Sequence, residues 1–88
     1  MTGGTKMKRD MYYVVLGEQI ATFRKARKYT QQDLADRLKV SRETVSSWEK
    51  GRREPNIKEV DMIADVLGTT SEELCKKSQK YLFKEEYL

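Results

Sequence analysis

Eighty-eight residues suffice for one small domain, whose core buries so little surface that well-packed helices or partner chains matter for its stability. With one cysteine, Cys75, and no histidine, the chain has neither an internal disulfide nor a Cys/His zinc site, and no Ser/His/Asp or Cys/His catalytic set. We therefore predict a protein that is not an enzyme and that needs no metal or cofactor.

The net charge of +4 is unevenly divided along the chain. Residues 1–53 carry 13 Lys and Arg against 6 Asp and Glu (+7), and residues 54–88 carry 5 against 8 (−3), which together give +4. Any single basic residue can simply solvate a helix face, but the asymmetry favours a polyanion bound to the first half of the chain.

Residues 1–13 are predicted to form a flexible basic extension. Its Lys6, Lys8 and Arg9 either remain in a flexible tail or enter a minor groove as an arm. The longest apolar run near the start, residues 11–16, is too short for a membrane span or a secretory signal. We expect a soluble protein of the cytoplasm, associated with the nucleoid.

The first helix is predicted over residues 14–28. Apolar residues at a spacing of four and then three line one side of it: Leu16, Ile20 and Phe23. The basic residues from Arg24 onward suit the negative end of the helix dipole. Asp10 is a candidate N-cap, and residues 11–13 either extend this helix or pack beside it.

A capping box, TQQD at residues 30–33, predicts the start of the second helix. Its inward residues are Leu34, Ala35 and Leu38. A second cap, Ser41, comes three residues after the last of these, so the chain must turn sharply before a third helix begins at Arg42. The inner side of the third helix consists of Val45, Trp48 and Glu49. Gly51 can adopt the left-handed conformation that ends it.

Two further helices complete the predicted all-α fold. Pro55 blocks continuation of the third helix, Asn56 caps the fourth, and Glu59 takes its third position. Apolar residues then follow at helical spacing up to Gly68: Val60, Ile63, Ala64 and Leu67. TSEE at residues 70–73 caps a short fifth helix. No segment alternates clearly enough to predict a strand, so five helices account for residues 14–77.

Two eight-residue helices joined by a three-residue turn, with a basic helix before them and an Arg-rich loop after them, describe a helix-turn-helix. Residues 16–74 resemble the Cro/C1-type (XRE) family of bacterial and phage regulators through TQQDLA, the turn LKVS, SSWEKGRREP, and IADVLG followed by EEL. The resemblance implies a five-helix, lambda-repressor-like domain over residues 14–77. Such a domain binds operator DNA, usually as a dimer, to regulate transcription.

The third helix, residues 42–50, is the predicted reader of the major groove, which is about 12 Å wide and admits one helix. Arg42 can bond guanine O6 and N7 or hold a phosphate, and Glu43 can accept from a cytosine amino group. Ser46 and Ser47 can contact either edge of a base pair. For each of these residues the plainer alternative is a solvated helix face.

Phosphate contacts are predicted on either side of that helix. Gln31 stands at the start of the second helix, where backbone N–H groups and the dipole attract anions, and its amide can add a bond. Lys50, Arg52 and Arg53 follow the third helix, where the backbone of the same groove should lie. A solvated loop is the alternative for the two arginines.

The family resemblance also implies an ion pair between Arg24 and Glu49, since members carry an Arg and a Glu at the matching positions of the first and third helices. Both residues fall toward the inner side of their helices, where an isolated charge is costly, so we expect the pair to fix one helix against the other. Family members often have Gly in the turn, where this chain has Lys39. We predict a positive φ at that residue.

Three features leave alternatives open. Trp48 is predicted to be a core residue rather than a base-stacking one, and Cys75 a small buried or semi-exposed residue rather than a redox sensor. The apolar tail, residues 78–88, either folds back on residues 11–13 as an added helix or strand, or forms a homodimer surface with the fifth helix. We favour the homodimer, because half-sites about 34 Å apart call for symmetric partners.

The predicted function is a sequence-specific regulator, a repressor that binds a pseudo-palindromic operator in double-stranded DNA as a homodimer. The alternative is a protein-interaction module of the same fold, such as an antitoxin or an anti-repressor partner, in which DNA binding is secondary. A regulator loses its site preference when Arg42 is replaced, whereas an interaction module loses its function when the tail is removed.

Overall fold

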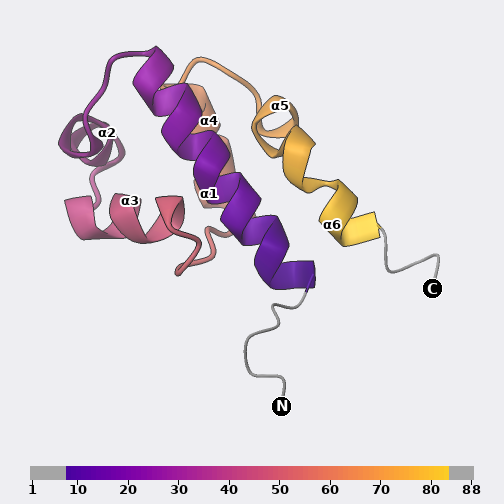
Figure 1. Ribbon diagram of the computed structural model, residues 1–88. Helices are drawn as coiled ribbons and strands as arrows, with labels where there is room; N and C mark the ends of the chain where they lie inside the picture. Colours follow the sequence, from indigo (N-terminus) through magenta and orange to yellow (C-terminus); the bar gives the residue numbers. More distant parts are fainter. Residues whose placement is uncertain (1–7, 84–88) are drawn as a thin grey trace.

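The computed structural model describes residues 8–83, which form helices joined by short loops, with no strand among them. The elements are α1 (Lys8–Ala26), α2 (Gln31–Leu38), α3 (Arg42–Glu49), α4 (Ile57–Val66), α5 (Ser71–Cys75), the 3₁₀ turn η1 (Lys76–Ser78) and α6 (Lys80–Phe83). The predicted all-α class and the helix-turn-helix at α2 and α3 are confirmed (Figure 1). The described part of the chain has six α-helices, where the sequence predicted five. None of these helices is long and apolar enough to cross a bilayer.

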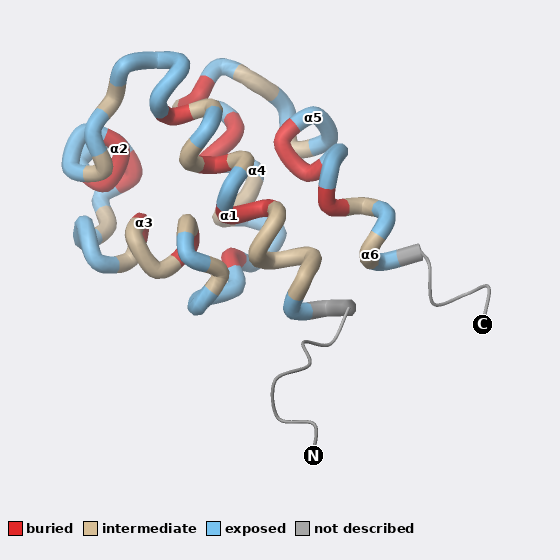
Figure 2. Tube along the Cα trace, viewed as in Figure 1, coloured by how far each residue is buried: buried red, intermediate tan, exposed pale blue. Residues whose placement is uncertain are grey.

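α1 runs through the middle of the molecule, with α3 against one side and α5, η1 and α6 against the other (Figure 1). α4 packs against both α2 and α5. The buried apolar residues are Leu16, Ile20, Leu34, Ala35, Leu38, Val45, Trp48, Ile63, Ala64, Leu67, Leu74 and Cys75. They lie on the inward sides of the helices (Figure 2), so one core formed from α1 to α5 holds the domain together.

The start of α1 differs from the prediction. The helix is already formed at Lys8, so the flexible extension predicted for residues 1–13 is wrong from Lys8 onward, and Asp10 lies inside the first turn instead of capping the helix. Tyr12 and Tyr13 are half-buried and pack against the core, and this burial favours continuing the helix toward the N-terminus. Lys6 lies outside the described residues, as do the side chains of Lys8 and Arg9.

The end of α1 also differs from the prediction, since the helix stops at Ala26 rather than at residue 28. Lys28 has a φ of 63°, a left-handed conformation that breaks the helical path. The Tyr29 N–H then donates to the Arg24 carbonyl at 3.2 Å and closes the last turn.

The turn between α2 and α3 has the predicted conformation. Lys39 has a φ of 61° and a ψ of 42°, and its N–H donates to the carbonyls of Ala35 and Asp36. The Val40 N–H donates to the Ala35 carbonyl as well, at 3.0 Å. These bonds satisfy the free carbonyls at the end of α2 and fix the angle at which α3 leaves it.

The ends of the helices follow from local side-chain chemistry. Apart from Asp10, the predicted N-caps are present: Thr30 for α2, Ser41 for α3, Asn56 for α4 and Thr70 for α5. Each side-chain oxygen accepts the N–H of the residue three positions later, which satisfies one unpaired donor at the helix start. Gly51 and Gly68 have φ values of 73° and 74°, which few other residues adopt, and they follow α3 and α4.

The described part of the tail packs within the chain, against α1. Both η1 and α6 contact α1, as one of the two alternatives for the tail requires, while Tyr87 and Leu88 lie outside the described residues. Ser78 is fully buried, and its hydroxyl donates to the Cys75 carbonyl at 2.8 Å. Cys75 is buried too. Burial first, and then a hydrogen bond with the Cys75 thiol, raise the pKa of Tyr12 to about 12.

Candidate nucleic-acid interface

α3 has an inner side fixed in the core and an outer side that faces away from it. Val45 and Trp48 are buried on the inner side. Positions 42, 43, 46 and 47 recur one turn apart, so the structure brings the four predicted base-contact residues together on the outer side. These residues are Arg42, Glu43, Ser46 and Ser47, the first two exposed and the serines half-buried.

The exposed end of this face is the first turn of α3. Arg42 Nη2 lies 3.8 Å from Glu43 Oε2, with 50% of the arginine side chain and 78% of the glutamate side chain exposed. An exposed ion pair of this length is weak, so both head groups remain available to a ligand. Ser41 caps the same turn by accepting the Thr44 N–H at 3.1 Å, which fixes the backbone from which the two side chains project.

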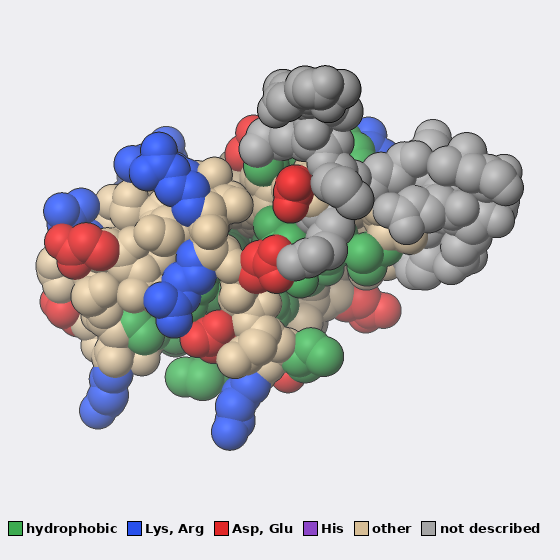
Figure 3. All heavy atoms as spheres, turned by 90° about the horizontal axis from the view of Figure 1, so that it is seen from below, with side chains coloured by type: hydrophobic (Ala, Val, Ile, Leu, Met, Phe, Trp, Pro, Cys, Tyr) green, Lys and Arg blue, Asp and Glu red, His purple; other side chains and the backbone are tan. Residues whose placement is uncertain are grey.

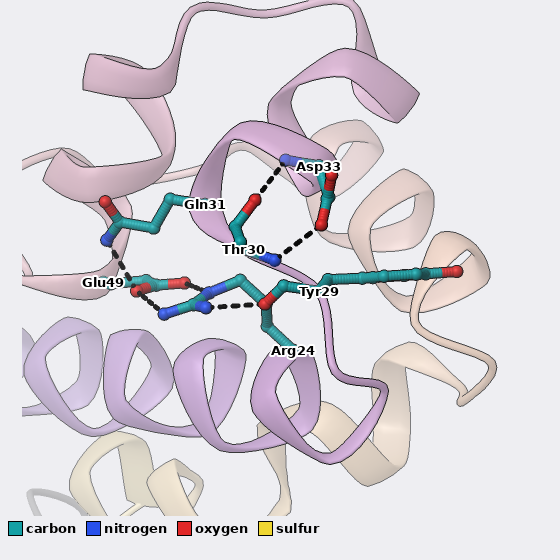
Figure 4. A network of polar contacts seen from close by, with 6 residues as sticks. All are labelled: Arg24, Tyr29, Thr30, Gln31, Asp33 and Glu49. Carbon is teal, nitrogen blue, oxygen red and sulfur yellow. Dashed lines mark hydrogen bonds and ion pairs between the residues drawn. The ribbon is translucent and has the colours of Figure 1, made fainter.

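A buried ion pair joins α3 to α1, at the two residues that the family resemblance indicated. Arg24 Nε donates to Glu49 Oε2 at 2.6 Å, and Arg24 Nη2 donates to Glu49 Oε1 at 3.0 Å (Figure 4). Only 9% and 7% of the two side chains are exposed. Arg24 Nη1 also donates to the Tyr29 carbonyl at 2.8 Å, so one guanidinium ties together α1, the loop before α2, and α3.

Gln31, predicted to contact phosphate, also belongs to this network. Its Nε2 donates to Glu49 Oε1 at 2.9 Å, and Figure 4 shows its amide directed at that carboxylate. The contact places the start of α2 beside the last turn of α3. A second amide N–H and the amide oxygen remain for a ligand. No local pattern in the sequence signals this contact, because its two residues are 18 positions apart.

Gly17 is a further residue on which the position of α3 depends, and its role was not predicted from the sequence. A Cβ at this position of α1 would collide with the Trp48 carbonyl oxygen and lie 2.7 Å from the Glu49 carbonyl oxygen. Only glycine therefore allows the backbones of α1 and α3 to approach this closely. The available signal was a glycine inside a predicted helix, a position at which glycine costs about 1 kcal/mol relative to alanine and which is therefore unusual without a close backbone contact.

The basic residues that follow α3 start from a fixed piece of backbone. The N–H groups of Arg52 and Arg53 both donate to the Ser47 carbonyl, at 2.9 Å and 3.3 Å. The side chains of Lys50, Arg52 and Arg53 are exposed. In the view from below, Lys and Arg side chains gather over the end of the molecule that holds α2 and α3 (Figure 3). Gln31 reaches the same last turn of α3, so all four predicted phosphate contacts share one end of this helix.

Comparison with known proteins also assigns the chain a helix-turn-helix fold. The helix-turn-helix family HTH_3 matches residues 20–74, more than half of the sequence. The chain belongs to this family of DNA-binding transcriptional regulators. The HTH-type transcriptional regulator YqaE of Bacillus subtilis is 33% identical over 82% of this chain, and DicA of Escherichia coli is 43% identical over 61% of it. The chain spans 63% of YqaE and 40% of DicA.

Solved structures show the same fold. ClgR, the clp gene regulator of Corynebacterium glutamicum, superposes with a TM-score of 0.74 at 23% identity, over 80% of this chain and 90% of ClgR. Apo-HppE superposes with a TM-score of 0.67 at 32% identity, over 70% of this chain but 35% of HppE. Within residues 8–83 of the present protein, no group of His, Cys, Asp and Glu side chains is suited to hold a metal ion.

Proposed function

We propose that the protein binds double-stranded DNA sequence-specifically by placing α3 in the major groove, and that it regulates transcription in this way. One observation carries the proposal: four polar side chains share the outer side of α3, while its inner side is tied to α1 by a buried ion pair. A helix fixed in this manner presents its polar groups in a defined geometry, as base recognition requires. Arg42 and Glu43 at its first turn are the proposed principal base contacts, joined by Ser46 and Ser47.

The last turn of α3 and the loop after it are proposed to hold the DNA backbone. Lys50, Arg52 and Arg53 are exposed there, and the Gln31 amide contacts Glu49 in the last turn of the same helix. Phosphate contacts of this kind supply affinity for every sequence and make binding depend on salt, while contacts to base edges supply the preference.

We further propose that the protein is a repressor that binds a two-fold symmetric operator as a homodimer, in the cytoplasm with the nucleoid. Half-sites one turn of DNA apart, about 34 Å, suit two copies related by a two-fold axis. An exposed apolar residue on α6, Leu82, supports a partner surface near the tail, because 46% of it is accessible. A reporter gene placed behind the selected operator tests the direction of regulation, and repression is the expected result.

Selection of bound duplexes from a random pool tests the proposal. The expected product is a motif of two inverted half-sites whose centres are about 10 base pairs apart. A pool that stays random after repeated selection at physiological salt contradicts sequence-specific binding. A single half-site contradicts the dimer alone.

A further inference from the structure

An open groove of about 440 Å³ lies between α1, α4 and α5. Apolar side chains form most of its wall, among them Tyr12, Leu16 and Val60. Ile57, at the start of α4, lines the groove as well, and with 84% of its surface exposed it is the most exposed large apolar residue within residues 10–82. An apolar groove next to an exposed apolar side chain is typical of an interaction surface.

The charge of the groove is negative. Asp61 and Glu72 line it, and no Lys or Arg is among its lining residues in the described chain. Asp61 accepts a hydrogen bond from the Ser71 hydroxyl, which links α4 to α5 along the groove. The occupant that fits such a groove carries an apolar side chain and positive charge.

The same chain carries a surface of that kind on η1 and α6. Lys76, Lys77 and Lys80 are exposed there, Tyr81 is half-buried, and 46% of Leu82 is accessible. We call these five residues the basic α6 surface. The three lysines and the tyrosine line a hollow together with Val15 of α1. Basic groups therefore lie next to apolar ones on this surface, whereas acidic groups lie next to apolar ones in the groove.

We propose that the groove of one copy receives the basic α6 surface of a second copy, and that the second groove receives the first α6, in a two-fold dimer. Reciprocity follows from the symmetry, because in such a dimer residue i contacts residue j and residue j contacts residue i. Docking of two grooves against each other instead places Asp61 and Glu72 of both copies together, and like charges oppose that arrangement. This inference rests on the proposed dimeric regulator and names its interface.

Charge complementation between two variants tests the interface directly. Glu72→Lys sets positive charge against the basic α6 surface, and Lys80→Glu sets negative charge against the groove, so each variant alone is expected to self-associate at least about tenfold more weakly than the wild-type chain. An equimolar mixture restores both contacts, since each variant then meets the opposite charge on the other. Sedimentation equilibrium of the full chains measures all three samples. A mixture that remains monomeric overturns the proposal, and so does a wild-type chain that is monomeric at high concentration.

Matched variants separate the interface from general effects of charge and hydrophobicity. Glu73→Lys changes the residue next to Glu72 that does not line the groove, and Met62→Asp removes an exposed apolar residue outside it. Both are expected to self-associate like the wild type, whereas Ile57→Asp weakens association about as much as Glu72→Lys. Equal loss in Met62→Asp and Ile57→Asp overturns the assignment to the groove.

Binding to a single half-site distinguishes failure of the interface from failure of DNA recognition. Glu72→Lys is expected to keep the half-site affinity of the wild type and to lose the extra affinity for two inverted half-sites. A variant that associates weakly but still binds two half-sites cooperatively contradicts the interface and leaves the DNA-binding proposal standing. A wild-type chain that forms the dimer but binds no half-site specifically contradicts the DNA-binding proposal and leaves the interface standing.

Discussion

The inner side of α3 is held by Val45, Trp48 and an ion pair with α1, whereas its outer side carries four polar side chains with one long contact among those described, between Arg42 and Glu43. The first arrangement fixes where the helix lies, and the second leaves groups free to meet a ligand. Under the proposed function, the position of the helix and the recognition of DNA therefore depend on different residues of the same eight-residue helix. Changes on the inner side are expected to alter stability, and changes on the outer side to alter binding.

Two glutamates of α3 show the difference within one residue type. Glu49 is 7% exposed in its side chain and accepts bonds from Arg24 and Gln31, whereas Glu43 is 78% exposed and lies 3.8 Å from Arg42. A glutamate carboxylate is therefore a structural group at position 49, near the end of the helix, and a candidate recognition group at position 43, near its start. Burial and partners, not residue type, decide which it is.

Replacement of Glu49 by Ala is expected to cause the largest loss of stability among changes to the inner side of α3. The substitution leaves the Arg24 guanidinium buried without its carboxylate, and we expect the free energy of unfolding to fall by about 3–5 kcal/mol. Urea denaturation measures it. The control is Glu43→Ala on the outer side of the same helix, where the expected change is within about 0.5 kcal/mol. Equal losses in the two variants contradict the division between the two sides.

Replacement of Gly17 by Ala tests the contact between α1 and α3. The added methyl group meets carbonyl oxygens of Trp48 and Glu49, which are backbone atoms and cannot rotate away, so we expect a loss of about 1–3 kcal/mol. Glu18→Ala, at the exposed neighbouring position, is the matched control. If Gly17→Ala is as stable as this control, the two helices have room that the structure does not show.

Glu49 and Gly17 also show the limit of what can be predicted from the sequence. The helix caps could be predicted, because each depends on a side chain and an N–H three residues apart. The positive φ of Lys39 could be predicted from the turn that the family resemblance implies. The bond between Gln31 and Glu49 and the close approach at Gly17 depend on how distant segments pack, which leaves no periodic signal. Extension of the first helix over residues 11–13 was one of two alternatives, and the helical turn before them, from Lys8 to Asp10, was missed for the same reason. Tyr12 and Tyr13 are half-buried against the core, which no local pattern indicates.

Replacement of Lys39 by Gly is expected to stabilise the protein slightly. A lysine in the left-handed region costs about 1–2 kcal/mol, and glycine removes this cost but loses about 0.5–1 kcal/mol through the entropy of the unfolded chain. The expected net gain is about 0.5–1 kcal/mol, measured as an increase in the urea midpoint. Lys28→Gly, at a φ of 63°, should behave alike, and a loss of stability in both variants contradicts the left-handed assignment.

Alkaline titration tests the side of α1 away from α3, and its effect is confined to high pH. The pKa of Tyr12 is raised from 10.0 to about 12 by burial and then by its hydrogen bond with the Cys75 thiol. The folded state therefore holds this proton more tightly than the unfolded state, and the resulting stability is complete below pH 10 and is lost as the pH rises toward 12. We expect Tyr12→Phe to show a shallower decline in this window. An identical decline in the variant contradicts the assignment to Tyr12.

The most direct measurement is fluorescence anisotropy of the wild type, Arg42→Ala and Arg52→Ala on the selected operator and on a scrambled duplex, over a series of salt concentrations. We expect Arg42→Ala to lose about 1–3 kcal/mol on the operator and little on the scrambled duplex, and Arg52→Ala to weaken binding to both and to reduce the salt slope by about one. Equal affinity of the wild type for both duplexes, or equal losses for Arg42→Ala on both, contradicts the assignment of base recognition to the outer side of α3.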